Sequence, residues 1–444
     1  MQLTKHLDKG LWAIADKSLF AIYGVGFMFL VIRVLPKEEL GVFVLVQNAF
    51  LILGHLSVCL GLSPLVKFIH EIKDRGALIA AAVYLQVGFI TVALIVMWLV
   101  REPMGMALKS PEFAKLFYFV PLLFVAAFGK LLAVEILRSL FRIREVFWSD
   151  LAYFGSNLTL IFFLTRSGAF DSARDQLMIQ VASFAFSSVV SIGLCRRFVS
   201  WSWKPPREVM LRLFHFGKFL LGSGINGQIY ERSDVFMISA FVGPAEVAVY
   251  YSAKVFLRVY DMYRQAVNLL ALPVFARLKA EGRMRDICIV YEKGVFFSQV
   301  ALLAVMAALI FGANIFYDIF YQERYAGGEI FLRGLSLSGI FLAWLVFSDS
   351  VLSSIGRPDK SFRARGAATA LSVVLNYLLI RSFGSLGAVA ASVISTAFLA
   401  ILMTAQAKSE IGFTWAGIWQ RHRDVTNFLR KGLQTLTRNV FRGN

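Results

Sequence analysis

The stretch GALIAAAVYLQVGFITVALIVMWLV occupies residues 76–100 and contains no charged side chain among its 25 residues. The hydrocarbon core of a bilayer is ~30 Å thick, and a helix that rises ~1.5 Å per residue crosses it in about 20 residues. Because that core holds no water, the backbone of such a segment must satisfy its hydrogen bonds internally. Residues 76–100 are therefore predicted to form a transmembrane helix.

Eleven further apolar runs lie on either side of this one. Apolar residues make up 58% of the 444 and charged residues only 17%, whereas soluble proteins average about 45–50% and about 25%. The sequence thus predicts an all-α polytopic membrane protein with about 12 transmembrane helices. The predicted spans are Leu11–Leu35, Leu40–Leu62, Gly76–Val100, Phe113–Leu137, Val146–Thr165, Gln176–Leu194, Leu213–Val242, Ala245–Leu272, Gly294–Phe316, Glu329–Leu352, Ala364–Arg381 and Ser385–Ala407.

The 46 Lys and Arg residues are distributed unevenly between the predicted loops. The N-terminus, every second loop and the C-terminal tail hold 29 of them, and the intervening loops hold 8. An excess of Lys and Arg is typical of the cytoplasmic side of a membrane protein. Both termini are therefore expected in the cytoplasm. We attribute the net charge of +18 to topology and predict no nucleic-acid partner.

A repeat divides the chain into two halves. The segment LPKEELGVF at residues 35–43 links the first two spans, and VGPAEVAVY at residues 242–250 links the seventh and eighth. Each is a turn with a proline and an acidic residue that opens a long helix, so the repeat is parallel. Such repeats place a substrate site between two bundles that rock for alternating access. The predicted domains are a six-helix bundle at residues 1–195, a cytoplasmic connector at 196–212, a second bundle at 213–408 and a basic tail at 409–444.

The tail is predicted to be an amphipathic cytoplasmic element. From Trp415 to Val440 apolar side chains recur at near-helical spacing, and residues 413–444 contain six Lys and Arg residues and one acid, Asp424. A helix of this composition binds the surface of an anionic leaflet. The alternative is a partly frayed basic tail.

The sequence gives no sign of a metal or nucleotide site. The five histidines and three cysteines have no ligand spacing, and no glycine-rich phosphate loop with a following Lys is present. Cys59, Cys195 and Cys288 are expected to be small packing residues. We therefore predict no metal, no cofactor and no direct use of ATP, so that transport depends on an ion gradient or on the gradient of the substrate.

Four short segments resemble those of a known family. Gly10–Trp12, Ile32–Phe43, Asp234–Ile238 and Gly243–Tyr250 are similar to segments of the bacterial polysaccharide-biosynthesis flippases, within the multidrug, oligosaccharidyl-lipid and polysaccharide exporter superfamily. The resemblance implies two six-helix bundles around a central cavity. It also implies transfer of an undecaprenyl-pyrophosphate-linked oligosaccharide from the cytoplasmic to the periplasmic leaflet of the inner membrane. The predicted number of spans favours the O-antigen type over the lipid II flippases. The implied partners are the lipid-linked oligosaccharide, membrane lipids and proteins of lipopolysaccharide or other polysaccharide assembly.

Ionisable side chains inside the predicted spans indicate the site. Each costs about 2.5–3.5 kcal/mol at mid-bilayer, and residues 254, 258, 261, 265 and 268 share one face of a helix at about 100° per residue. This face is expected to line water or substrate. The predicted substrate-binding cations are Lys254, Arg258, Arg264, Arg232 and Lys17. The predicted polar and aromatic cavity residues are Tyr230, Tyr250, Tyr251, Gln265 and Asn268, and the candidates for a coupling ion are Asp234 and Asp261.

Arginine binds phosphate through its planar fork and lysine as a point charge, so we expect these cations to attract the pyrophosphate. The alternative is that the charges neutralise one another in a structural network. Lys130 and Glu135 are about 140° apart around their helix, which makes a mutual ion pair doubtful.

Two other functions compete with the flippase. A cation-coupled multidrug exporter of the same superfamily would present acids and aromatic rings to cationic drugs, whereas this sequence has surplus Lys and Arg in the spans. An enzyme would hold catalytic groups outside the bilayer, and the longest outward loop, Arg101–Glu112, contains no nucleophile–base pair. The sequence therefore predicts a transporter without catalytic residues.

Overall fold

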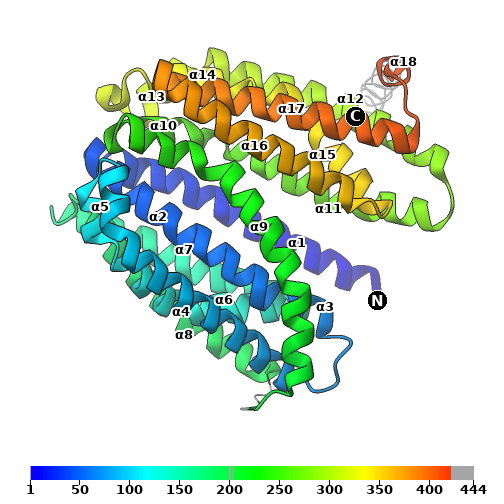
Figure 1. Ribbon diagram of the computed structural model, residues 1–444, viewed down its shortest axis with the longest axis horizontal. Coiled ribbons are helices and arrows are strands. Elements are labelled where there is room, and N and C mark those ends of the chain that lie inside the picture. The colour runs from blue at the N-terminus through cyan, green and yellow to red at the C-terminus, as the bar shows by residue number, and fades with distance from the viewer. Residues whose placement is uncertain (1, 200–201, 203, 422–444) are drawn as a thin grey trace, which may run out of the picture. The chain divides into compact units, whose positions relative to one another are not determined.

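The computed structural model describes residues 2–199, 202 and 204–421, and every regular element in these ranges is a helix (Figure 1). Each predicted span coincides with one helix or with consecutive helices. Seven helices in this part of the chain are long and apolar enough to cross a membrane, or eight if one pair bent by 44° forms a single span. The chain is thus an all-α, multi-pass membrane protein. The larger number of crossings remains a prediction.

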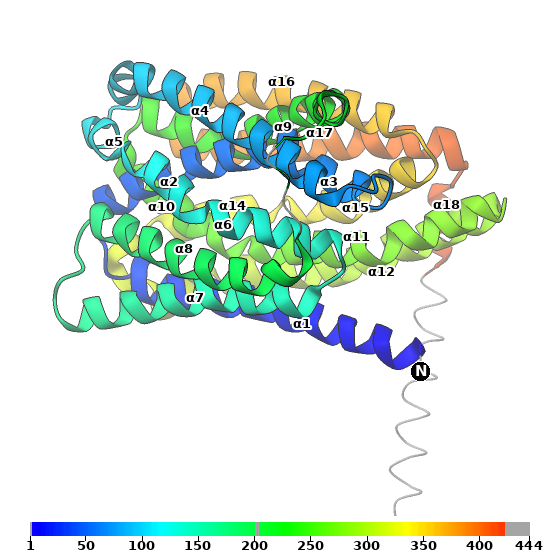
Figure 2. The same ribbon diagram turned by 90° about the horizontal axis from the view of Figure 1, so that it is seen from below.

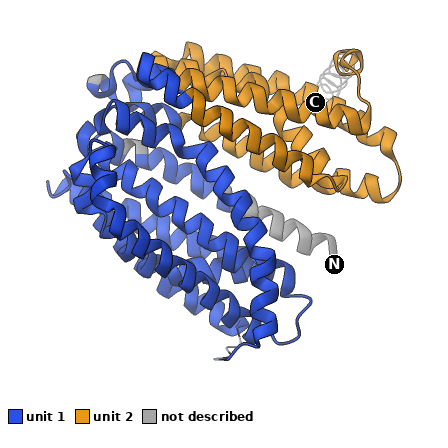
Figure 3. Cartoon of the chain, in the orientation of Figure 1, with its two compact units in different colours: residues 1–255, 316–328, 376–388 blue, residues 256–315, 329–375, 389–444 orange. Residues whose placement is uncertain are grey.

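The chain divides into two compact units (Figure 3). Unit 1 comprises residues 1–255, 316–328 and 376–388, and unit 2 comprises residues 256–315, 329–375 and 389–444. Residues 213–255, which begin the second predicted bundle, thus belong to the same compact unit as the first predicted bundle. The predicted boundary at residues 196–212 follows from the repeat and remains a prediction.

Unit 1 contains α1 (Gln2–Phe27), η1 (Met28–Ile32), α2 (Lys37–Ser57), η2 (Val58–Leu62), α3 (Ser63–Phe68), α4 (Arg75–Ala107), α5 (Pro111–Leu116), α6 (Phe119–Ser139), α7 (Ile143–Arg166), α8 (Ala173–Cys195), η3 (Arg196–Phe198), α9 (Arg207–Phe241), α10 (Pro244–Phe256) and η4 (Gln322–Tyr325). Unit 2 contains α11 (Arg258–Ala280), α12 (Met284–Phe311), α15 (Gly339–Ser354) and α18 (Trp415–Gln420). The boundary between the units falls at the last residue of α10, Phe256, and within α13 (Ala313–Phe320), α14 (Gly328–Ser336), α16 (Pro358–Phe383) and α17 (Ser385–Ile411).

The eighth predicted span is not one helix. It is divided into α10 and α11 at Leu257, and α11 continues to Ala280. The prediction of a continuous helix over residues 245–272 is therefore wrong at this point. Leu257 is neither proline nor glycine, so no local signal in the sequence indicates the break.

Unit 1 has an apolar core to which α9 contributes. Helix α8 packs against both α6 and α7, and α7 packs against α1 (Figure 2). Leu62, Leu78 and Leu137 are fully buried in one cluster with Leu213, the α9 residue of that cluster. Burial of leucine side chains stabilises such a cluster by about 1.5–3 kcal/mol each, and it fixes the start of α9 within unit 1.

The two repeat segments meet in unit 1. Gly41 on α2 lies against the backbone carbonyl of Pro244 at the start of α10, and a Cβ at residue 41 would overlap that oxygen. Only glycine allows helix backbones to approach this closely. The two turns recognised as sequence equivalents are therefore also neighbours in the fold.

Replacing Gly41 by Ala is expected to lower the free energy of unfolding by about 1–3 kcal/mol, because overpacking forces the backbone of α10 to move. The measurement is unfolding of the purified protein in detergent. Gly88→Ala on α4 is the matched control, since no heavy atom of the described chain lies within 4 Å of its added Cβ. Equal stability of the two variants would contradict the close contact.

The core of unit 2 includes the residues that follow α17. Tyr291 on α12 is fully buried, and its ring centroid is 4.6 Å from that of Phe413. Ile418 on α18 belongs to the same buried cluster, and the Arg421 guanidinium pairs with Glu292 at 2.7 Å. The first residues of the predicted tail are therefore part of a packed core. Residues 422–444, the remainder of the predicted amphipathic element, lie outside the described residues.

Candidate functional site

Asp234 on α9 is the centre of a buried polar cluster in unit 1. Its Oδ2 accepts hydrogen bonds from Lys254 Nζ and from the Tyr250 hydroxyl, each at 2.7 Å. Its Oδ1 accepts from the backbone N–H of Val235 at 2.8 Å. The Asp234 side chain is 8% exposed and that of Lys254 is 29% exposed. The carboxylate is thus fully hydrogen-bonded and paired, as a buried charge requires.

This arrangement bears on three predicted site residues. Lys254, expected to bind substrate, is joined to Asp234, expected to carry a coupling ion. Tyr250, expected to line a cavity, is fully buried. An ion that binds at Asp234 has to replace the ammonium group of Lys254. For these three residues, the geometry favours mutual neutralisation within the bundle.

Arg232 precedes Asp234 by two residues and is held in a different way. Its Nε donates to Gln228 Oε1 at 2.8 Å, and its Nη1 donates to Asn48 Oδ1 on α2. Both acceptors belong to neutral amides that are at least nine-tenths buried. These bonds orient the guanidinium without cancelling its charge. The carboxylates of Glu231 and Asp234 act on it electrostatically.

A cavity of about 170 Å³ lies beside Arg232, between α2 and α9. Its walls are mostly aliphatic and aromatic. They are formed by Ile52, Leu56, Ile225, Gln228, Ile229, Arg232, Ser233 and Phe236. Apolar walls next to a guanidinium suit a ligand that has both a hydrocarbon part and an anionic part.

In unit 2, α11 carries the remaining polar face. Arg258, Asp261, Gln265 and Asn268 lie on one side of this helix, at about 100° per residue. Arg264 Nη2 donates to Asp261 Oδ1 at 2.9 Å, with both side chains substantially exposed. Asn268 Oδ1 accepts from Ser350 Oγ on α15 at 2.9 Å. The α11 part of the predicted polar face is therefore continuous, with Asn268 tied to a neighbouring helix.

The other predicted residues lie in unit 1. Tyr230 and Tyr251 are partly exposed residues of α9 and α10. Lys17 falls within α1, but its side chain lies outside the described residues.

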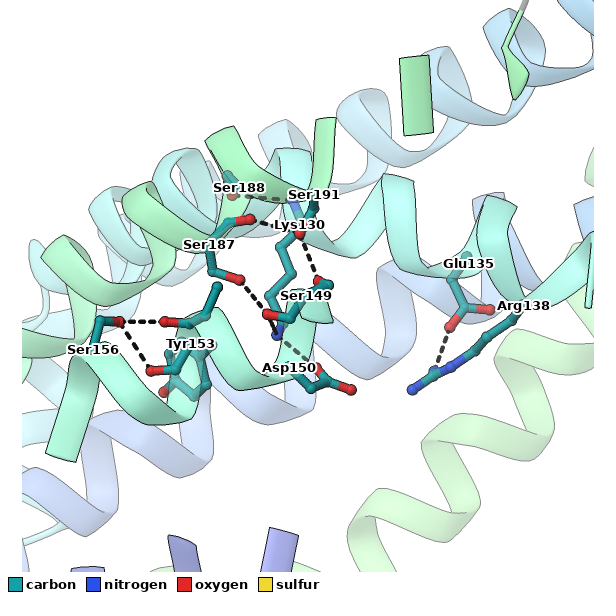
Figure 4. A network of polar contacts seen from close by, with 11 residues as sticks. Lys130, Glu135, Arg138, Ser149, Asp150, Tyr153, Ser156, Ser187, Ser188 and Ser191 are labelled. Atoms are coloured by element: carbon teal, nitrogen blue, oxygen red, sulfur yellow. Dashed lines mark hydrogen bonds and ion pairs between the residues drawn. The ribbon is translucent and has the colours of Figure 1, made fainter. Parts of the chain in front are cut away.

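Sequence reasoning missed a second buried ion pair, between α6 and α7 (Figure 4). Lys130 Nζ is 2.6 Å from Asp150 Oδ1 and donates to the Ser149 carbonyl at 3.2 Å. The two side chains are 10% and 14% exposed. Ser187 Oγ also donates to the Ser149 carbonyl, and the Ser149 hydroxyl pairs with that of Ser191 on α8 at 2.6 Å. Lys130 is therefore bound into a polar seam that joins α6, α7 and α8.

The doubt about a Lys130–Glu135 pair is supported by the structure. Glu135 accepts instead from Arg138 Nη1 at 2.9 Å, one turn further along α6 (Figure 4). Asp150 lies early in the fifth predicted span, and its acidic character was the available signal. Its partner could be found only by knowing which helices pack together.

Residues 30–330 match the model of a family described as polysaccharide biosynthesis protein, and the match covers more than half of the chain. The chain belongs to this family. The resemblance drawn from the short sequence segments is thereby confirmed.

One curated relative of this polysaccharide biosynthesis protein is named "Probable low-salt glycan biosynthesis flippase Agl15" and comes from Haloferax volcanii. It is 25% identical over 392 residues, which cover 86% of this chain and 80% of the relative. The chain is thus similar to a protein named as a flippase.

Solved structures show the fold of the family member. Lipid II flippase MurJ in an inward closed conformation has a TM-score of 0.75 at 15% identity, covering 92% of this chain and 89% of its own. An inward-facing multidrug resistance MATE family transporter of the MOP superfamily has a TM-score of 0.73 at 16% identity, covering 91% and 94%. These similar proteins are flippases and transporters rather than enzymes. The predicted fold class is confirmed.

Proposed function

We propose that this protein is a flippase for an undecaprenyl-pyrophosphate-linked oligosaccharide. It moves that lipid from the cytoplasmic to the periplasmic leaflet by alternating access and supplies assembly of a surface polysaccharide such as O-antigen in lipopolysaccharide. The family and a relative named as a glycan biosynthesis flippase support the proposal. The observation that carries it is Arg232, a cation within α9 whose hydrogen-bond partners are two neutral amides.

The chemistry of the cargo explains why such an arginine is useful. A pyrophosphate diester carries negative charge on oxygens that accept paired hydrogen bonds, and the guanidinium fork matches that geometry. With Nε and Nη1 engaged by Gln228 and Asn48, the side chain is pre-oriented, so little rotamer entropy is lost on binding. The adjacent apolar cavity of about 170 Å³ suits the first part of an isoprenoid chain.

The remaining predicted residues complete the proposal. Lys17, Lys254, Arg258 and Arg264 are further cations for the pyrophosphate, and Tyr230, Tyr250, Tyr251, Gln265 and Asn268 are candidates for contacts with the glycan. Lys254 binds the cargo only when its pair with Asp234 opens. Asp234 and Asp261 are the candidates for a coupling cation, and no catalytic residue is proposed. In this topology both termini are cytoplasmic, in the bacterial inner membrane.

Depletion of the protein in its host tests this function. The expected result is accumulation of an undecaprenyl-linked oligosaccharide on the cytoplasmic leaflet, detected by its protection from a glycan-modifying enzyme added outside. Normal arrival of the oligosaccharide on the outer leaflet would show that the proposed cargo is wrong.

A cation-coupled multidrug exporter is the second candidate, because the fold is also that of MATE transporters. A cationic drug requires an available carboxylate, whereas Asp234 already accepts three hydrogen bonds and pairs with Lys254. Depletion that raises drug sensitivity without lipid accumulation would favour the exporter.

Replacing Arg258 by Ala is expected to abolish transport while expression and folding stay intact. The reason is that α11 then loses a cation from the polar face that it shares with Gln265 and Asn268. The same leaflet assay measures the effect in cells. Normal transport by the folded variant would remove Arg258 from the proposed site.

A further inference from the structure

A second cationic pocket lies in unit 1, away from the Arg232 cavity. It has a volume of about 720 Å³ and is lined by Arg33, Val34, Tyr321, Gln322 and Arg324. These residues come from the turn after η1 and from η4. They lie at the end of the unit that also holds α5 and the start of α10 (Figure 1). The alternation of charged loops predicts that this end faces the periplasm.

Arg324 is anchored at the end of the first span. Its Nη1 donates to the carbonyls of Arg33 at 2.7 Å and Leu35 at 3.4 Å, and also to that of Val34. The last carbonyls of a helix lack partners within the helix, and a basic side chain commonly caps them. In the described part of the chain, the other N–H groups of this guanidinium are not engaged. Arg324 is therefore held in place by one nitrogen and keeps donors for a ligand.

Arg33 supplies the second positive charge. Its carbonyl is used by Arg324, whereas its side chain lines the pocket. Among the described side chains, no carboxylate lies within ion-pair distance of Arg33 or Arg324. Glu38 acts electrostatically on Tyr325, the residue that follows Arg324, without an ion pair to either arginine. Two guanidinium groups thus share a pocket in which neither has a described carboxylate as an ion-pair partner.

The backbone of the pocket is unusual at Gln322. This residue has a backbone φ of +54°, a left-handed conformation that is uncommon for residues other than Gly, Asn or Asp. Such conformations are energetically unfavourable and concentrate at ligand-binding sites. The conformation brings an amide side chain to the same pocket as the two arginines.

Hydrogen bonds connect the pocket to the proposed transport residues. The Tyr321 hydroxyl donates to the Ser252 carbonyl at 3.0 Å, and the Tyr317 hydroxyl pairs with Ser252 Oγ at 2.9 Å. Ser252 lies on α10, two residues before Lys254. The outer pocket is therefore attached to α10, the short helix that carries Lys254.

We propose that this pocket binds the phosphate of a lipid headgroup at the outer end of unit 1, with Arg33, Arg324 and Gln322 as the ligand-contacting residues. The role of the pocket rests on the proposed function. A pyrophosphate that has crossed the membrane has to move from the cations of the proposed transport site, such as Arg232, to the outer end of the protein. Two sources share this chemistry: the isoprenoid pyrophosphate of the cargo and the phosphate of a membrane phospholipid.

Equilibrium binding of farnesyl pyrophosphate to the full chain in phosphatidylcholine nanodiscs tests the pocket. Arg33→Gln removes a charge without touching the carbonyl that Arg324 caps. Arg324→Lys keeps a charge but loses the fork. Each variant is expected to weaken the binding of farnesyl pyrophosphate at this pocket by about tenfold to hundredfold, the loss typical of a hydrogen bond to a charged group. Arg174→Gln, an exposed arginine on the first turn of α8, is the control and is expected to bind as the wild type does.

Measuring both pocket variants in an Arg232→Gln background separates the outer pocket from the proposed transport site. The loss is expected to persist there. Wild-type affinity of Arg33→Gln in both backgrounds would overturn the pocket, whether or not the protein flips a glycan. Loss of binding in a protein that proves not to be a flippase would uphold the pocket and remove only its proposed role.

Repeating the measurement with phosphatidylglycerol in the nanodisc identifies the source. Competition by this lipid assigns the pocket to phospholipid headgroups. Undiminished binding of farnesyl pyrophosphate assigns it to the isoprenoid carrier.

Discussion

Replacing Arg232 by Gln is expected to slow translocation of the lipid-linked oligosaccharide by about tenfold to hundredfold, since hydrogen bonds to a charged group contribute about 1.5–3 kcal/mol. Glutamine retains polarity and much of the length but carries no charge. Arg232→Lys is expected to translocate at a rate between those of the wild type and Arg232→Gln, because lysine keeps the charge and loses the planar fork. The rate of arrival of the oligosaccharide on the outer leaflet measures the effect.

Two controls make the result specific. Lys218→Gln removes an exposed cation from the same helix and is expected to leave the rate unchanged. Thermal unfolding of each purified variant shows whether the loss comes from instability, since Arg232 also bonds to Gln228 and Asn48. A folded Arg232→Gln protein with the wild-type rate would exclude this residue from the substrate site.

Replacing Lys130 by Ala is expected to lower the free energy of unfolding by about 3–5 kcal/mol, because removal of one partner leaves a buried charge unpaired. Asp150 would then keep its carboxylate in a seam where it is 14% exposed. Denaturation of the detergent-purified protein, followed by helical circular dichroism, measures the loss.

A double variant, Lys130→Met with Asp150→Leu, is expected to recover most of this stability, since apolar replacement of a whole buried pair is often neutral. Lys115→Ala provides the exposed counterpart. Its pair with Glu112 has side chains that are 69% and 52% exposed, and loss of such a pair costs about 0–1 kcal/mol. A Lys130→Ala variant as stable as Lys115→Ala would contradict the burial of the pair.

The sequence predicted the helical elements well because length and apolarity alone define them. Every predicted span coincides with helical structure, and each repeat segment begins in a turn and opens a helix, α2 from Lys37 and α10 from Pro244. The break at Leu257 had no local signal, since no proline or glycine marks it.

The candidate site was only partly predictable, because a sequence pattern describes one helix and not the contacts between helices. Helical spacing placed Arg258, Gln265 and Asn268 on one face, a property of one helix. It could not show that Lys254 pairs with Asp234, or that Lys130 pairs with Asp150, because each pair joins two helices. The amides that hold Arg232 lie 4 and 184 residues away in sequence, and only the nearer of them was within reach of a helical pattern.

The packing of the chain after α17 has a practical consequence for shortening the protein. Phe413 and Ile418 fill the same cluster as Tyr291, and Arg421 is the partner of the buried Glu292. A truncation at Ile411 would therefore leave a cavity beside α12 and leave the buried carboxylate of Glu292 without its ion-pair partner. A stop codon or an affinity tag placed after Arg421 keeps these contacts, so any shortened form of this protein has to extend at least ten residues beyond the end of its last long helix.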